Sequence, residues 1–255
     1  MSLQRLPAEL KLRLLGFLEL QSLVSLRNTC RFWYDLIQSS LSQPHIIPSS
    51  RAELLRLYLD LHKFESFKPS RKHIVPYIKS FPRQEYLDRL RDEFAKDPNW
   101  SIPEQFSTWI LEWPTNAVIG WVWPGLHNEF NSWAHPRVLS LYTDPNGEAH
   151  WWRTYGSNEL RWTPQSSSFA SSDAFDNALH LMVHEHGGGY ITTICFDNDP
   201  KLHGTVWFGG AFNHVEGEID LDNPNWYGHK WVKRDWVTWL RGELEGIEMQ
   251  YNWNP

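Results

Sequence analysis

Apolar residues recur at helical spacing through the first forty residues of the chain. Leu10, Leu14 and Leu18 stand four residues apart, and with Leu15 and Phe17 they predict a wide apolar stripe on an amphipathic helix. Pro7 suits the first turn of this helix, because the N–H that proline lacks would have no helical partner there. A second short helix, capped by Ser22, and a third that begins near position 30 complete the predicted unit. Three short helices cannot bury so many large apolar groups, so we expect another molecule to cover the surplus.

The next sixty residues keep the helical spacing but carry more charge. Residues 40–50 contain two prolines and several serines, which predicts a linker. Amphipathic patterns over 51–61, 73–79 and 84–94 predict three further helices, with a break at Pro69. These helices form a predicted spacer between the N-terminal unit and the rest of the chain.

From residue 100 onward the pattern changes to short apolar runs between turn residues. A helix is predicted over 102–113 and another over 231–247, each with large apolar side chains on one face. Glycine and proline clusters between the runs predict turns, and the serine-rich segment 165–173 predicts a surface loop. The predicted strands cover residues 117–123, 138–142, 150–154, 179–184, 190–196 and 205–208. This order predicts an α+β fold, with N-terminal helices followed by a mainly antiparallel sheet with flanking helices.

Three short motifs occur in order near the N-terminus. Leu-Pro-x-Glu-Leu starts at Leu6, Leu-x-Ser-Leu-x-x-Leu-Arg starts at Leu20, and Cys-Arg-x-Trp-x-x-Leu-Ile starts at Cys30. Together they resemble the F-box, a three-helix motif that docks on a Skp-type adaptor and so joins a cullin–RING ubiquitin ligase. The resemblance implies that the residues contacting the adaptor are Leu6, Pro7, Leu10, Leu14, Leu18, Leu23, Leu26, Trp33 and Ile37.

A second set of motifs lies in the C-terminal part. Ile-Pro-Glu-Gln-Phe-x-x-Trp-Ile starts at Ile102, Tyr-Ile-x-x-Ile-Cys-Phe-Asp-x-Asp-Pro at Tyr190, and Gly-Thr-Val-Trp at Gly204. They resemble the SUKH superfamily, the fold of the fungal Smi/Knr cell-wall-synthesis regulators, and the whole arrangement is similar to F-box proteins of filamentous fungi. The resemblance implies a recognition role and supplies no catalytic residues. The predicted organisation is an F-box at 1–40, a helical spacer at 41–99 and a Trp-rich SUKH-like domain at 100–255.

Composition narrows the function further. The formal net charge of −6 disfavours the phosphate attraction on which nucleic-acid binding depends. No apolar run reaches transmembrane length and no secretory leader precedes the first helix, so no membrane span is expected. Two cysteines far apart, Cys30 and Cys195, favour a reducing compartment without disulfides. We therefore expect a cytoplasmic or nuclear protein.

Candidate catalytic chemistry is sparse. His184 and His186 lie on one side of a predicted strand, an arrangement that some metal sites use, but no third ligand follows at a usable spacing. The acidic residues between 197 and 222 lack the glycine and terminal glutamate of a calcium-binding EF-hand loop. Gly187 to Gly189 precede a strand rather than a helix, so they do not form a phosphate-binding loop. We expect no bound metal and no cofactor.

Tryptophan is unusually abundant, and its distribution is uneven. The chain has 16 tryptophans, and only Trp33 precedes residue 99. Three interpretations stay open: filling of a small α+β core, a surface that recognises a protein, or a pocket for an apolar small molecule. For a pocket or target site, the candidate residues are Trp121, Trp123, Trp151 and Trp207.

Two functions follow from these patterns. In the first, the protein is the substrate-recognition F-box subunit of a Skp–cullin–RING ubiquitin ligase and binds its unknown target through the Trp-rich domain. In the second, a stand-alone protein of fungal secondary metabolism folds its apolar stripe onto its own spacer helices and binds a lipophilic small molecule. Such a protein is a candidate cofactor-free cyclase or pericyclase of the Diels–Alderase type, because that chemistry needs shape and desolvation rather than a motif.

Overall fold

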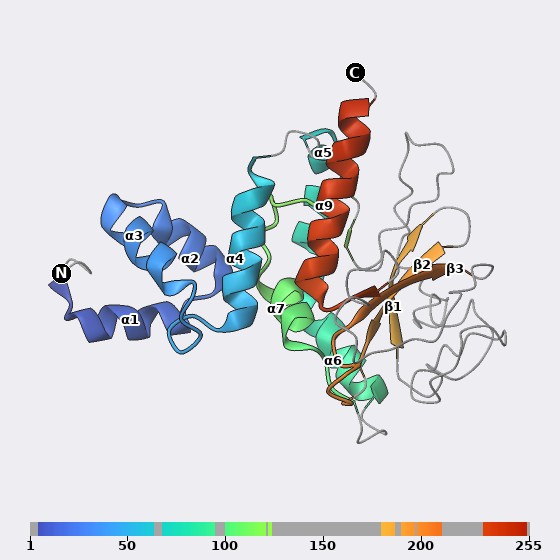
Figure 1. The fold of residues 1–255 in the computed structure, drawn as a ribbon, viewed down its shortest axis with the longest axis horizontal. Coiled ribbons are helices and arrows are strands. Elements are labelled where there is room, and N and C mark those ends of the chain that lie inside the picture. Colours follow the sequence, from blue (N-terminus) through green and yellow to red (C-terminus); the bar gives the residue numbers. More distant parts are fainter. Residues whose placement is uncertain are drawn as a thin grey trace.

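A computed structural model describes residues 5–63, 68–94, 100–120, 122–123, 180–186, 190–196, 198–210 and 232–253. In these ranges, three short helices lie at one end of the molecule and a four-stranded sheet at the other (Figure 1). Longer helices lie between the two ends and connect them. The α+β fold that the sequence predicts is confirmed.

The N-terminal unit consists of α1 (Ala8–Phe17), α2 (Leu20–Arg27) and α3 (Arg31–Ser40). Leu15, Leu23 and Ile37 come from the three different helices, and all three are fully buried. Three helices are therefore confirmed, with an interior of their own. The predicted cap at Ser22 is wrong, because α2 begins at Leu20, two residues earlier, and Ser22 lies inside the helix.

The spacer forms α4 (Ser49–Leu61), α5 (Lys68–Ser80) and α6 (Arg83–Phe94). Buried residues lie on several sides of α4, which runs between the N-terminal unit and the helices nearer the sheet (Figure 1). The predicted break at Pro69 is wrong, because Pro69 lies in the first turn of α5, where a missing N–H costs no helical hydrogen bond.

The C-terminal part contains α7 (Glu104–Glu112), the sheet and α9 (Trp236–Trp253). The strands are β1 (His180–His186), β2 (Tyr190–Cys195), β3 (Val206–Gly210) and β4 (Val232–Lys233). They follow one another in the order β1-β2-β3-β4, with antiparallel pairing throughout and an irregularity in β1 between Met182 and His184. Three of the predicted strands thus correspond to β1, β2 and β3.

Two predicted elements of this part are wrong. Residues 117–120 and 122–123, the described part of one predicted strand, form no strand. Gly120 has a φ of 50°, and the N–H of Val122 bonds the carbonyl of Ile119 at 3.0 Å, so the chain turns here. The helix predicted from residue 231 begins at Trp236, because residues 232–233 pair with β3. The strands predicted at 138–142 and 150–154 and the loop at 165–173 lie outside the described residues.

Aromatic rings fill the core between α7 and α9. Trp109 of α7 lies 4.6 Å from the Trp123 ring and 5.0 Å from the Trp236 ring, measured between centroids. Phe106 meets Trp236 edge-on at 5.0 Å, an arrangement that aromatic pairs prefer. These rings belong to one cluster of buried residues that extends from Leu15 in α1 to the last third of the chain. The N-terminal unit and the C-terminal part therefore share a continuous core.

Candidate adaptor-binding surface

An apolar stripe on α1 is open to solvent. Leu10, Leu14 and Phe17 are spaced by four and three residues, so they share one face of the helix. The exposed fraction of Phe17 is 83% and that of Leu10 is 48%, whereas Leu14 is partly buried. Leu15 points to the other side and is fully buried. The α1 helix thus has one apolar face inside the protein and a second one outside it.

An aromatic ring of α3 adjoins this stripe. The ammonium of Lys11 lies 4.6 Å from the ring centroid of Phe32, which places Phe32 beside α1. Phe32 is 43% exposed, and its ring meets the buried Trp33 edge-on at 5.2 Å. The contacts with Lys11 and Trp33 hold the ring in place. We call Leu10, Leu14, Phe17 and Phe32 the α1–α3 surface.

The residues that the F-box resemblance implies as adaptor contacts fall into two groups. Leu23, Trp33 and Ile37 are buried in the N-terminal unit, where they hold the three helices together. The other six residues retain exposed area: Pro7 and Leu10 are exposed, and Leu6, Leu14, Leu18 and Leu26 are partly buried.

The predicted adaptor contacts leave out two exposed aromatic residues. Phe17 stands seven residues after Leu10 and belongs to the predicted apolar stripe, but not to the predicted contact residues. Phe32 directly precedes Trp33, and the predicted contacts on α3 are Trp33 and Ile37, both of which are buried. The exposure of Phe32 appears only when the packing of α3 against α1 is known.

A partly buried ion pair lies where the N-terminal unit meets the rest of the protein. Arg51 of α4 donates hydrogen bonds to Glu112 of α7, from Nε at 2.9 and 3.0 Å and from Nη2 at 2.8 Å. The two side chains are 22% and 11% exposed. The hydrogen bonds to Glu112 raise the pKa of the Arg51 guanidinium. Both side chains also contact backbone groups of the N-terminal unit: Arg51 donates to the carbonyl of Gly16, and Glu112 accepts from the N–H of Leu20.

The tryptophans predicted for a pocket or target site are only partly described. Trp123 is 1% exposed and packs between Trp109 and Phe81, at 4.6 and 5.7 Å between ring centroids. Trp207 is also buried, and its Nε1 donates to the hydroxyl of Thr205 at 2.8 Å. Both rings fill core positions. Trp121 and Trp151 lie outside the described residues, so the four are not brought together here.

The part of the chain that the structure describes shows no group of three or more histidine, cysteine or acidic residues that could hold a metal ion. The backbone of the predicted histidine pair belongs to β1, where His184 is opposite Thr192 and His186 is opposite Tyr190. The side chains of the pair are outside the described set. Among the described helices, none combines the length and the apolar character that crossing a membrane requires.

The comparisons with known proteins identify the N-terminal unit. The F-box-like family model matches residues 3–42, the segment that contains α1, α2, α3 and the whole α1–α3 surface. This segment is an F-box-like domain. The match supports, in general terms, a role as a substrate-recognition adaptor of a Skp–cullin ligase. The chain has no match among the curated proteins and none among the solved structures that were compared.

Proposed function

We propose that this protein is the substrate-recognition subunit of a Skp–cullin–RING ubiquitin ligase. In this proposal the F-box-like domain binds the Skp-type adaptor through the α1–α3 surface, and the part of the chain beyond residue 100 binds the target. The observation that carries the proposal is the exposure of Leu10 and Phe17 within the segment that matches the F-box-like family.

The apolar stripe is not covered by the chain's own helices among the described residues. A stand-alone protein with a repurposed F-box would turn Leu10 and Phe17 onto its spacer helices, yet Leu10 is 48% exposed and Phe17 83% exposed. Nothing in the described ranges favours the small-molecule alternative, since the described tryptophans contact one another or other core residues.

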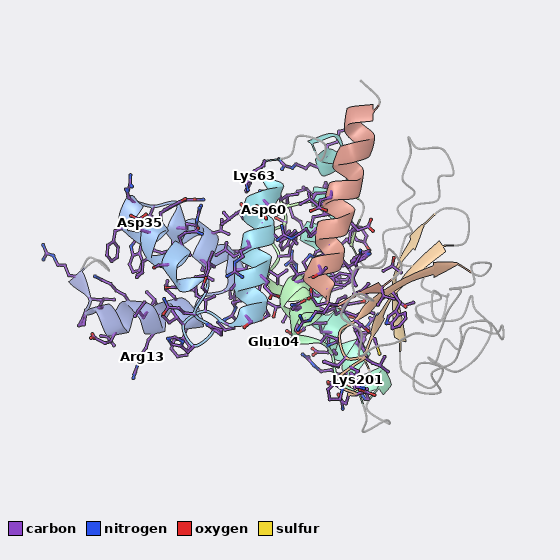
Figure 2. The ribbon with its side chains drawn as sticks, in the orientation of Figure 1. Arg13, Asp35, Asp60, Lys63, Glu104 and Lys201 are labelled. Atoms are coloured by element: carbon purple, nitrogen blue, oxygen red, sulfur yellow. The ribbon has the colours of Figure 1, made fainter. Side chains whose placement is uncertain are left out.

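The α1–α3 surface offers apolar area for a partner to bury. Complete burial of one fully exposed large apolar side chain contributes roughly 1.5–3 kcal/mol. Because the four side chains are already partly covered, together they contribute on the order of 3–6 kcal/mol before the costs of association. Arg13 and Asp35, which extend into solvent from α1 and α3, place charged groups around this unit (Figure 2). An apolar centre with a charged rim is the usual organisation of a protein–protein interface.

For the target, the proposal assigns the Trp-rich part of the chain. Its support is the enrichment of tryptophan at binding hot spots and the resemblance to the SUKH superfamily, which implies recognition. The resemblance to SUKH proteins and to F-box proteins of filamentous fungi remains a prediction from the sequence, as does the division at residues 40 and 99. The proposed site of action is the cytosol or the nucleus, where cullin–RING ligases work.

Co-purification tests the proposed function. The tagged full-length chain is co-expressed with a Skp-type adaptor and a cullin, and we expect both to be retained through affinity and size-exclusion steps. Phe17→Asp places a charge in the apolar contact and should abolish retention, because an unpaired buried charge costs several kcal/mol. Leu111→Asp is the matched control, since Leu111 is an exposed leucine on α7, outside the F-box-like domain. Equal retention of the adaptor by the two variants would contradict the proposal.

A further inference from the structure

The helices of the F-box-like domain receive hydrogen bonds at their ends from residues outside the matched segment. The carbonyl of Gly16, near the end of α1, accepts from Nη1 of Arg51 at 3.1 Å. The N–H of Leu20, the first residue of α2, donates to Oε2 of Glu112 at 2.8 Å. The carbonyl of Leu41, just after α3, accepts from Nη2 of Arg56 at 2.6 Å. Each of the three helices therefore has one end completed by a side chain of α4 or α7.

These contacts have the polarity that helix ends require. A helix end leaves N–H groups unpaired at its start and carbonyls unpaired at its finish, with partial positive and negative charge respectively. The carboxylate of Glu112 lies at the start of α2, and the guanidinium groups of Arg51 and Arg56 lie at the ends of α1 and α3. The N-cap residues of α1, α2 and α3 make no side-chain capping hydrogen bond of their own. Glu112 thus supplies to α2 what its own N-cap residue, Glu19, does not.

The α1–α2 turn has two of these contacts. Arg51 and Glu112 bond each other as well as the turn, so Gly16, Leu20 and the ion pair form one connected network. A Cβ on Gly16 would approach the carbonyl oxygen of Ile46 to 2.8 Å, which shows how closely the backbone packs there. The exposed Phe17 is the next residue after Gly16. The network therefore fixes the position of the α1–α3 surface relative to α7.

The helix that carries Glu112, α7, is also bonded to α4 and α9. At its start, Glu104 accepts from the hydroxyl of Ser50 of α4 at 2.7 Å, and Gln105 donates to Glu53 of α4. The carbonyl oxygen of the Gln105 side chain accepts from the N–H of Val237 in α9 at 3.2 Å. Figure 2 places Glu104 where α4 meets α7, at the opposite end of α4 from Asp60. Through α7, the F-box-like helices and α9 are linked by one series of hydrogen bonds.

We propose that Arg51, Arg56 and Glu112 are positioning residues for adaptor binding: they complete the F-box-like helices from outside and couple the adaptor surface rigidly to the target-binding part. This inference rests on the proposed function. It adds that the segment 3–42 depends on α4 and α7 for its binding-competent shape, and that Glu112, 92 residues after Leu20, belongs to the adaptor-binding machinery.

Amide hydrogen exchange on the full-length protein, measured by NMR, tests the capping without any adaptor. In Glu112→Ala we expect the N–H of Leu20 to exchange about tenfold faster. The N–H of Trp239, which donates to the carbonyl of Asp235 in the first turn of α9, should exchange at an unchanged rate. Glu104→Ala is the matched control, because it removes a carboxylate from the same helix that also bonds α4 but does not touch residues 16–20. Glu112→Gln, which keeps an oxygen to accept from Leu20, should lie between wild type and Glu112→Ala.

Calorimetric titration of the same variants with a Skp-type adaptor tests the positioning role. We expect Glu112→Ala to weaken adaptor binding about tenfold, Glu112→Gln to restore part of that loss, and Glu104→Ala to change the affinity less than twofold. If Glu112→Ala does not fold, Glu112→Gln and Arg51→Lys replace it in both the exchange and the titration measurements. Arg51→Lys keeps the charge but loses the donor to Gly16. An unchanged Leu20 exchange rate, or an equal loss in Glu104→Ala, overturns the inference. If wild type itself does not bind the adaptor, the proposed function fails, and the Leu20 exchange rates still decide the capping claim.

Discussion

At Gly16 the packing leaves no space for a side chain. A Cβ at position 16 would lie 2.8 Å from the carbonyl oxygen of Ile46, closer than real Cβ contacts allow. The clash is with backbone, which cannot rotate away as a side chain can. Gly16 is therefore required because of the close approach between the end of α1 and the segment before α4.

For Gly16→Ala we expect a loss of about 1–3 kcal/mol in the free energy of unfolding, the usual cost of overpacking. Urea unfolding followed by tryptophan fluorescence measures it. Gly246→Ala is the matched control, since a Cβ there meets nothing within 4 Å and the residue lies inside α9. The control should gain about 0.5–1 kcal/mol, because alanine favours a helix interior over glycine. A Gly16→Ala protein as stable as wild type would show that the 16–46 approach is loose.

Glu243 gives the protein a pH-dependent stability. Burial of its carboxyl group raises the pKa of Glu243 to about 7 from 4.5, although Lys233 and a hydrogen bond with Trp239 act in the opposite direction. Between these two pH values the folded protein holds a proton that the unfolded chain releases. The stability contributed by this proton is complete below pH 4.5 and is lost as the pH rises through 7.

Glu243→Gln should remove this dependence. Between pH 5 and pH 8, wild type should lose on the order of 1–3 kcal/mol in the free energy of unfolding that Glu243→Gln does not lose, since one pKa unit corresponds to about 1.4 kcal/mol. Urea unfolding of both proteins at the two pH values provides the comparison. Glu245→Gln, an exposed position of the same helix, should change the free energy of unfolding by less than about 0.5 kcal/mol. Parallel pH profiles for wild type and Glu243→Gln would refute the assignment.

The packing of α9 on α7 and α4 combines apolar and ionic contacts that differ greatly in their contribution to the free energy of unfolding. Trp236 is 1% exposed and contacts Phe106, Trp109 and Trp239. Arg241, one turn further on, pairs with Asp60 of α4 at 2.6 Å, with both side chains about a third exposed. Solvent screens such a pair, so its net contribution is small.

We expect Trp236→Ala to lower the free energy of unfolding by about 3–5 kcal/mol, because it removes a large ring from a packed core. Arg241→Ala should cost less than about 1 kcal/mol. Both values come from the same urea titrations, and the contrast between them is the prediction. A larger cost for Arg241→Ala than for Trp236→Ala would mean that ionic contacts, not aromatic packing, hold α9 in place.

Helices were predictable from the sequence where apolar residues repeat at one spacing, as in α1, α3 and α7. The run at 117–123 shows why other elements were not. Val118, Ile119, Val122 and Trp123 are all buried, and short buried stretches are apolar whether or not they form strands. The positive φ of Gly120 makes the chain turn here. The presence of a glycine in the sequence does not predict this φ, because glycine adopts positive and negative values about equally.

For the whole molecule, the sequence predicted the fold class, an adaptor-binding unit and the leucines of its exposed face, Leu10 and Leu14, but not the aromatic contacts beside them. Trp33 and Ile37 carry the motif and lie inside, whereas Phe17 lies outside the motif and is the most exposed large apolar residue described. The contact of Leu20 with Glu112 joins positions 92 residues apart, which no local pattern signals. The candidate site therefore depends on tertiary packing between the F-box-like domain, α4 and α7.

Isothermal titration of the full-length chain with a Skp-type adaptor measures directly whether the α1–α3 surface binds that adaptor. We expect saturable one-to-one binding with a negative heat-capacity change, the mark of apolar burial. Leu10→Asp should weaken the affinity at least about a hundredfold, which corresponds to about 2.8 kcal/mol, and Leu111→Asp should leave it within about threefold. No binding by the folded wild-type chain, or equal affinity of wild type and Leu10→Asp, would show that the α1–α3 surface does not bind the adaptor.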